Sequence, residues 1–222
     1  MKLIEPCYNI VTDINRNNFY KLCEIPARKC YQSENRIAEG SAEKLIKILV
    51  KRRHEAMLEH CPNIQVNFIC DRAFSHELVR HRLCSFAQES QRYVKYENND
   101  MEFIIPHWLD KFKCSVIPQE TVKANTFLEA CETAERKYKM LRQLGLRPED
   151  ARGVLPNAVK TEITVTTNIR EWRHLLKLRT ANDAHPDMQR IMRPLLLDFI
   201  NYLPAFFEDI NHDWTNTTAK GE

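Results

Sequence analysis

Arginine, histidine and small polar side chains gather between Arg80 and Tyr93. The planar guanidinium of arginine binds phosphate or carboxylate through two parallel hydrogen bonds, so it orients an anion as well as attracting it. A polar, hydroxyl-rich run is a poor helix face and suits a loop that lines a cleft. These residues predict a site for an anionic ligand. Two alternatives stay open: a solvated basic surface with structural ion pairs, and a site for a nucleic-acid backbone.

The scarcity of glycine limits how such a site can be built, because the chain has only 4 glycines. Loops that cradle phosphates with backbone N–H groups need two or three glycines close together, and Gly40, Gly145, Gly153 and Gly221 are widely separated. A nucleotide must therefore be held by side chains, chiefly arginine. No metal site is predicted, because His76 and His81 miss the HExxH spacing that puts two histidines on one helix face.

The polar stretch resembles the signature of flavin-dependent thymidylate synthases, RHRxxSxNxxSxRY. The matching positions are Arg80, His81, Arg82, Ser85, Ser90, Arg92 and Tyr93. Ala87 stands where the signature has asparagine, which affects one polar contact and none of the phosphate-binding arginines.

Four other segments are similar to motifs of that family and follow the family's order. They are His54–His60 (HExxxEH), Arg152–Pro156 (ARxxLP), Asn168–Arg170 with His174 and Arg179 (NxR…[NH]xxxxR), and Ala184–Met188 (AxPEI). The resemblance covers about residues 40–200, and the first 40 residues and the tail carry little of it.

The resemblance implies an FAD-dependent methyltransferase of nucleotide biosynthesis. It would convert dUMP to dTMP, with methylenetetrahydrofolate as the carbon donor and NADPH as the reductant of a bound FAD. All of these ligands are anionic, which suits an arginine-rich and glycine-poor site. The family also implies a homotetramer whose active sites are shared between chains. The reduced flavin, and not Ser90 or Cys84 as a nucleophile, is expected to be the reactive partner.

The family's motifs assign roles to individual positions. Arg179 is expected to be catalytic, because a fixed guanidinium would stabilise negative charge spreading over the uracil. The residues expected at dUMP, with Arg92 and Arg152 as phosphate clamps, are Glu77, Leu78, Val79, Arg80, Gln88, Glu89, Ser90, Gln91, Arg92, Arg152 and Arg179. Those expected at FAD are Ala56, Arg80, His81, Arg82, Gln88, Asn168, Ile169, Arg170 and His174, with His54 and Glu59 at the flavin or folate.

Two other functions remain alternatives for this chain. A non-catalytic homologue that binds flavin or nucleotide is suggested by Ala87. A module that binds a nucleic-acid backbone is suggested by the arginine cluster, but the net charge of +3 is too small for a general nucleic-acid coat, so no nucleic-acid partner is expected.

Hydrophobic periodicity predicts the elements that position these residues. Helices are expected at residues 41–52 with Ser41 as the cap, at 71–82, at 119–143, from Pro148, after Asn168 as part of a capping box with Glu171, and at 187–203 with a bend or break near Pro194. Strands are expected at 64–70 and 163–167, a loop at 85–96, and a frayed tail from 211. Residues 1–40 show a mixed pattern.

These elements favour an α+β fold, with a small, mostly antiparallel sheet packed with several helices in a single catalytic domain over residues 1–222. No stretch has the roughly 18 apolar residues of a membrane helix, and Met1–Pro6 lacks the pattern of a signal peptide. The 8 cysteines form no CxxC pair and are interpreted as reduced, mostly buried thiols. A cytoplasmic protein is therefore expected.

Overall fold

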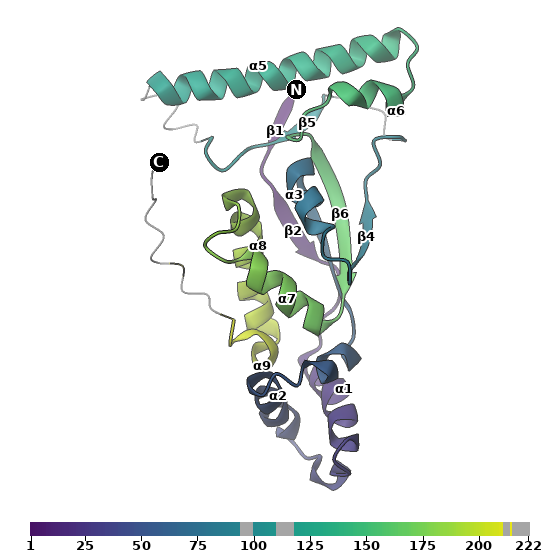
Figure 1. The fold of residues 1–222 in the computed structure, drawn as a ribbon, viewed down its shortest axis with the longest axis vertical. Coiled ribbons are helices and arrows are strands. Elements are labelled where there is room, and N and C mark those ends of the chain that lie inside the picture. The colour runs from purple at the N-terminus through teal and green to yellow at the C-terminus, as the bar shows by residue number, and fades with distance from the viewer. Residues whose placement is uncertain (94–99, 110–117, 211–213, 215–222) are drawn as a thin grey trace. The chain divides into compact units, whose positions relative to one another are not determined.

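The computed structural model describes residues 1–93, 100–109, 118–210 and 214. These residues fall into two compact units, which are described separately. Unit 1 comprises Met1–Cys7, Asn67–Arg80 and Phe86–Thr164, and unit 2 comprises Tyr8–Val66, His81–Ser85 and Val165–Glu222. The elements are labelled in Figure 1. The single catalytic domain expected from the sequence stays a prediction.

Four strands form the larger sheet, in the order β2-β3-β6-β4. Their bounds are Cys7–Ile10 for β2, Ile64–Asp71 for β3, Lys160–Thr167 for β6 and Ser85–Gln88 for β4. Gln65 hydrogen-bonds Thr166 at 3.1 Å and Asn67 hydrogen-bonds Thr164 at 3.0 Å, so the partners of β3 and β6 run in opposite directions. The expected α+β class with a mostly antiparallel sheet is confirmed.

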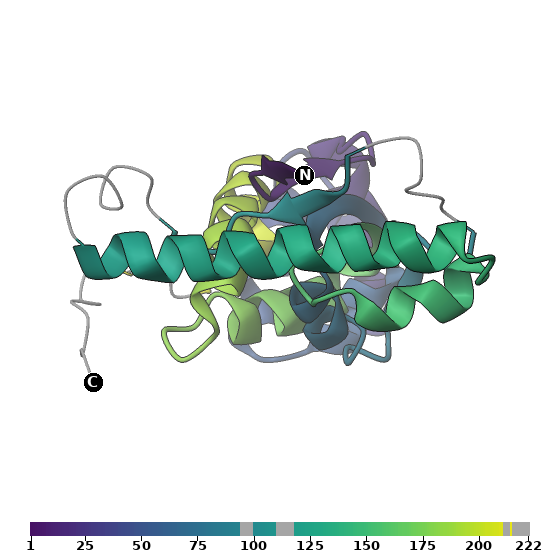
Figure 2. The same ribbon diagram turned by 90° about the horizontal axis from the view of Figure 1, so that it is seen from above.

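Unit 1 contains a second, smaller sheet covered by a long helix. Strand β1 (Lys2–Ile4) pairs in parallel with β5 (Glu102–Ile104). Helix α5 (Pro118–Gln143), which Figure 2 shows without interruption, packs Cys131 and Tyr138 against Phe103 and Val159. The unit also holds α3 (Arg72–Leu78), α6 (Pro148–Ala151) and the 3-10 turn η3 (Arg152–Val154).

Unit 2 is mostly helical. Its elements are α1 (Arg16–Lys29), η1 (Glu34–Arg36), α2 (Ser41–Lys51), η2 (Glu55–His60), α7 (Ile169–Arg179), α8 (Pro186–Tyr202) and α9 (Pro204–Phe207). Helix α7 packs against α8 and η2. Buried Trp172 anchors α7, with its ring against Phe199 and its indole N–H donating to the Ile64 carbonyl at 3.0 Å. This anchoring fixes the helix that carries the predicted catalytic arginine.

The alternating and amphipathic patterns predicted α2, β3, α3, α5, α6, β6, α7 and α8, whereas β1, β2, β5 and α9 were not predicted. Residues of β3 and β6 alternate between buried and less buried along both strands. Strand β6 begins at Lys160 and not at residue 163, because its buried Thr161 is polar and hides the alternation. Helix α1 was not predicted at all. Its many polar residues and the internal Pro26 conceal the apolar face formed by Phe19, Cys23 and Ala27.

Several boundaries were wrong. Gly40, with a φ of 70°, is the residue before α2, and the Ser41 hydroxyl instead donates toward Glu24 and the Ala38 carbonyl. Helix α3 stops at Leu78, short of Arg82, with Val79 as its C-terminal cap. Residues 85–88 form a strand and not a loop. Helix α8 continues through Pro194.

Some expectations fall outside the described residues, namely the loop beyond residue 93, Cys114 and the tail except Trp214. Of the seven cysteines described, Cys23, Cys61, Cys70 and Cys131 are buried, Cys84 is partly buried, and Cys7 and Cys30 are exposed. Within the described part of the chain, no helix combines the length and apolar character needed to cross a membrane.

Candidate active site

In unit 1, two of the predicted phosphate-binding arginines meet at one glutamate. The Arg92 Nε lies 3.3 Å from the Glu149 Oε2, and the Arg152 Nε–H donates to the Glu149 carbonyl at 3.2 Å. Arg147 lies 2.8 Å from the other carboxylate oxygen of Glu149. The Arg92 side chain is 54% exposed, so this cluster lies at the surface and is open to an incoming anion.

Local structure explains this convergence. The Glu89 N–H donates to the Glu162 carbonyl at 2.8 Å, which extends the pairing of β4 with β6 by one residue, and the chain then turns where the Tyr93 N–H donates to the Ser90 carbonyl at 3.1 Å. Pro148 starts α6, which places Glu149 in its first turn. The Arg92 guanidinium also lies over the Tyr93 ring, 5.5 Å from the ring centroid.

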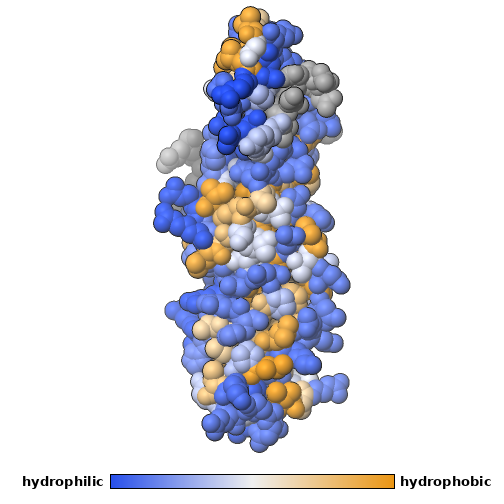
Figure 3. Space-filling view, turned by 90° about the vertical axis from the view of Figure 1, so that its right-hand side faces the viewer, coloured by the Kyte–Doolittle hydropathy of each residue, from blue (hydrophilic) through white to orange (hydrophobic). Residues whose placement is uncertain are grey.

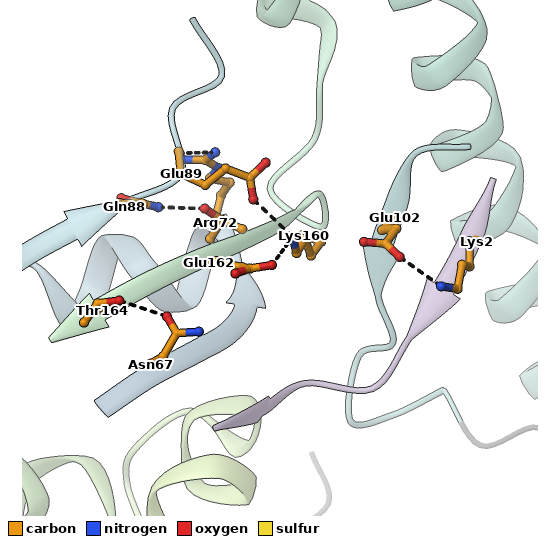
Figure 4. A network of polar contacts seen from close by, with 10 residues as sticks. Lys2, Asn67, Arg72, Gln88, Glu89, Glu102, Lys160, Glu162 and Thr164 are labelled. Carbon is orange, nitrogen blue, oxygen red and sulfur yellow. Dashed lines mark hydrogen bonds and ion pairs between the residues drawn. The ribbon is translucent and has the colours of Figure 1, made fainter. Parts of the chain in front are cut away.

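A polar network supports the predicted nucleotide contacts Gln88 and Glu89 (Figure 4). The Gln88 amide donates to the Ser75 hydroxyl at 2.9 Å and to the Thr161 hydroxyl at 3.2 Å. The Arg72 guanidinium donates to the Glu89 carbonyl at 3.0 Å. Residues of α3 and β6 therefore hold the Gln88 side chain, and Arg72 of α3 holds the Glu89 backbone.

Lys160 adds a cation to this network. Its ammonium lies 3.2 Å from a Glu89 oxygen and 2.6 Å from a Glu162 oxygen. Burial would lower the pKa of Lys160, but the two carboxylates outweigh burial and raise it. Lys160 therefore stays charged and holds Glu89 in place.

The other predicted dUMP contacts of unit 1 lie at the end of α3 or beside Arg92. Leu78 is fully buried, so only its backbone is available to a ligand, whereas Val79 and Arg80 are exposed and Glu77 is partly buried. Ser90 and Gln91 are partly buried in the turn that carries Arg92.

In unit 2, the predicted catalytic Arg179 is hydrogen-bonded to a buried histidine. The Arg179 Nε–H donates to the His81 Nε2 at 3.0 Å. The His81 Nδ1 lies 3.6 Å from the Glu171 Oε1, and its ring meets the His174 ring edge-on at 5.8 Å. Burial, the Arg179 cation and His174 together lower the pKa of His81 to about 4. His81 is therefore neutral at physiological pH.

Helix α7 arranges this group. The Asn168 side chain accepts from the Glu171 N–H at 3.0 Å and caps the helix, as the sequence predicted. Glu171 and His174 are three residues apart and so lie on neighbouring positions of the helix surface. Burial raises the pKa of Glu171, and His174 and Arg170 pull it the other way.

A second polar group of unit 2 joins residues predicted to bind FAD. The Arg170 guanidinium contacts the Glu59 carboxylate and lies 3.8 Å from the Glu55 carboxylate. Glu59 belongs to η2, which also carries Ala56 and is preceded by His54. Ile169 is fully buried and offers only its backbone, whereas Arg82, Arg170 and His174 are exposed.

The donors of His81, Glu171 and His174 lie within 4.8 Å of one another, a spacing that also suits a metal ion. The His81 Nε2 is already engaged by a guanidinium, and a second cation beside that charge would be repelled.

Sequence reasoning missed several supporting residues. Glu149 lies three residues before Arg152 on a helical turn, a spacing that could have revealed it. The capping pattern predicts Glu171 only as a partner of Asn168, although its spacing to His174 also places it near that ring. No sequence pattern distinguishes Arg72, Ser75, Lys160 or Thr161.

The chain matches known proteins over most of its length. Residues 14–205 match the family described as thymidylate synthase complementing protein. Proteins named flavin-dependent thymidylate synthase are similar to it: 34% identity to that of Pyrococcus furiosus over 74% of this chain and 65% of the relative, and 33% identity to that of Mycobacterium avium over 85% and 78%. The corresponding protein of Thermococcus onnurineus is 35% identical over 72% of this chain and 63% of its own. The chain therefore spans about two thirds of the length of the archaeal relatives.

The fold also has a solved counterpart. The crystal structure of a UMP/dUMP methylase, PolB from Streptomyces cacaoi, bound with 5-Br dUMP, superposes with a TM-score of 0.77 at 23% identity, covering 94% of this chain and 96% of that one. At this identity the likeness concerns the fold alone. The match over residues 14–205 and the relatives above 30% identity show the family: the chain belongs to the thymidylate synthase complementing proteins.

Proposed function

We propose that this protein is an FAD-dependent thymidylate synthase. It transfers the carbon of methylenetetrahydrofolate to dUMP and uses NADPH as the reductant, which yields dTMP. The observation that carries the proposal is the hydrogen bond of Arg179 to a neutral, buried His81. This hydrogen bond holds in place the guanidinium that the family motif assigns to the reacting base. The names of the curated relatives support the same reaction.

The phosphate of dUMP is held by Arg92 and Arg152. Both already contact Glu149, and a dianionic phosphate competes for the same guanidinium of Arg92 more strongly than a single carboxylate does. Ser90 and Gln91 supply further donors from the turn that carries Arg92. Gln88 and Glu89 are fixed below this turn and contact the nucleoside part.

Arg179 acts on the base. When C5 of uracil attacks, negative charge spreads toward N3 and the carbonyl oxygens, and a fixed guanidinium stabilises it. Because His81 is neutral, it adds no competing positive charge beside Arg179. The exposed Val79 and Arg80 contact the nucleotide from the end of α3.

The side chains of α7 fit an anionic flavin cofactor. Arg170 and His174 are exposed and lie one helical turn apart, while Trp172 and Leu175 on the opposite face are buried. Arg170 and Arg82, with Arg80, hold the FAD phosphates, and the Asn168 amide group donates beside its capping bond. Once bound, FAD supplies the hydride and carbon-transfer chemistry that no side chain here can supply.

The protein assembles as a homotetramer with shared sites in the cytoplasm. Two large side chains of the signature segment, Leu83 and Tyr93, are 77% and 74% exposed in the single chain, and a neighbouring chain that contributes to a shared site would cover them. Figure 3 shows hydrophobic patches scattered among hydrophilic residues on one face. Sedimentation measures the oligomeric state directly.

A turnover assay tests the function. Purified protein should be yellow, release FAD on denaturation, and form dTMP from dUMP, methylenetetrahydrofolate and NADPH. The Arg179→Ala variant should keep its circular dichroism spectrum and lose dTMP formation. A colourless protein that takes up no FAD, or an unchanged rate in Arg179→Ala, contradicts the proposal.

A further inference from the structure

His81 occupies a buried position whose hydrogen bonding is determined by Arg179. An arginine Nε–H can only donate, so the His81 Nε2 must be the acceptor across their 3.0 Å contact. The proton of the neutral imidazole then sits on Nδ1. This nitrogen faces the Glu171 carboxylate at 3.6 Å.

We propose that Glu171 and His81 form a positioning pair for Arg179. Glu171 selects the Nδ1–H form of His81, and His81 fixes the plane of the Arg179 guanidinium before the nucleotide arrives. The inference rests on the proposed function, in which Arg179 faces the uracil. It gives His81 a role distinct from the flavin contact that the family motif implies.

The contact with Glu171 acts through charge and not through a hydrogen bond. A separation of 3.6 Å is too long for a hydrogen bond, but a carboxylate that faces an imidazole N–H stabilises that tautomer electrostatically. Glu171 is 6% exposed, so water screens this interaction only weakly.

The groups that face His81 also keep it unprotonated. Burial, Arg179 at the Nε2 and the nearby His174 oppose an added positive charge, and they prevail over Glu171 at the Nδ1, which favours it. A protonated His81 would turn an N–H toward the Arg179 N–H and break the contact. Neutral His81 is therefore a condition for holding Arg179.

The backbone around His81 is well anchored. The Cys84 N–H donates to the His81 carbonyl at 3.0 Å, and the Thr167 hydroxyl donates to the Leu83 carbonyl at 3.3 Å. Arg179 is the last residue of α7, which buried Trp172 holds in the core. A free arginine side chain loses about 2 kcal/mol of rotamer entropy when it is ordered, and holding it beforehand removes part of that cost from the reaction.

Two substitutions of His81 separate positioning from flavin binding. His81→Phe keeps the ring shape and removes the acceptor, whereas His81→Gln restores an amide oxygen at similar reach. With FAD and dUMP both saturating, His81→Phe should lower kcat by about 10- to 100-fold, the range for a hydrogen bond to a charged group, and His81→Gln should recover most of that loss. In an Arg179→Lys background the guanidinium that His81 holds is gone, so adding His81→Phe should change kcat by no more than about twofold.

Two outcomes overturn the proposal. In the first, His81→Gln has a kcat as low as that of His81→Phe. In the second, the rate lost in His81→Phe is fully restored when the FAD concentration is raised, which makes His81 a flavin contact only.

A nitrogen NMR measurement gives a readout that does not need turnover. In the FAD-loaded protein, His81 should show a protonated Nδ1 and a bare Nε2 from about pH 6 to 8, and Glu171→Gln should admit some of the Nε2–H form. A cationic or Nε2–H His81 in the wild type refutes the positioning pair even if dTMP is made. Absence of dTMP with the expected NMR signals instead refutes the proposed function and leaves the contact with Arg179 established.

Discussion

Glu149 is expected to compete with the nucleotide phosphate, and Glu149→Gln tests this. The Glu149 carboxylate lies 3.3 Å from the Arg92 Nε. The phosphate must displace that carboxylate before Arg92 can bind it. An exposed pair of this kind is worth about 0.2–1 kcal/mol. Because 1.4 kcal/mol corresponds to about a tenfold change in Kd, Glu149→Gln should tighten dUMP binding by about 1.5- to 5-fold.

The contact of Arg152 should survive this substitution, because Arg152 donates to the Glu149 backbone carbonyl and not to its side chain. Asp150→Asn is a matched control for net charge. It removes one carboxylate at the next residue, which lies 3.6 Å from the Arg147 Nε. Titration calorimetry with dUMP at low and high salt measures both variants, and the gain should shrink as salt screens the charges. A Kd for Glu149→Gln that equals the Asp150→Asn value refutes the competition. Weaker dUMP binding by Glu149→Gln refutes it as well and shows that Glu149 preorganises Arg92.

Three further predictions concern the cofactor, the pH dependence and the helix cap. Arg170→Ala should raise the Kd for FAD by about 10-fold or more, the loss expected for a charge-assisted hydrogen bond, and FAD fluorescence quenching measures it; an unchanged Kd contradicts its assigned role. In the folded state the pKa of His81 is lowered to about 4 from 6.5, so between these pH values the unfolded chain binds a proton that the folded chain does not. The free energy of unfolding should therefore fall as the pH drops from about 6.5 to 4, and it should fall less in His81→Phe. Equal pH slopes in urea titrations of the two proteins would rule this out. Asn168→Ala should lower the free energy of unfolding by about 1 kcal/mol through loss of the cap on α7, and no change in the urea midpoint would mean that the cap contributes nothing.

The sequence predicted the helices and strands whose periodicity is undisturbed. Strand β3 and helix α5 follow their apolar patterns closely, because each buries one regular face. Patterns failed where polar side chains take buried positions, as Thr161 does in β6, or where a strand is short and at most partly buried, as β4 is. In these places tertiary contacts, and not local propensity, select the conformation.

For the site, residue identity establishes which side-chain types are available. The signature arginines, the cap at Asn168 and the absence of a glycine cradle follow from residue identity and spacing alone. The partners of these side chains depend on how the chain folds, as with Glu149 beside Arg92 and Glu171 beside His81. Hydrogen bonds and charge pairs between residues 57 to 98 positions apart leave no trace in local periodicity, because they depend on where the folded chain brings each segment.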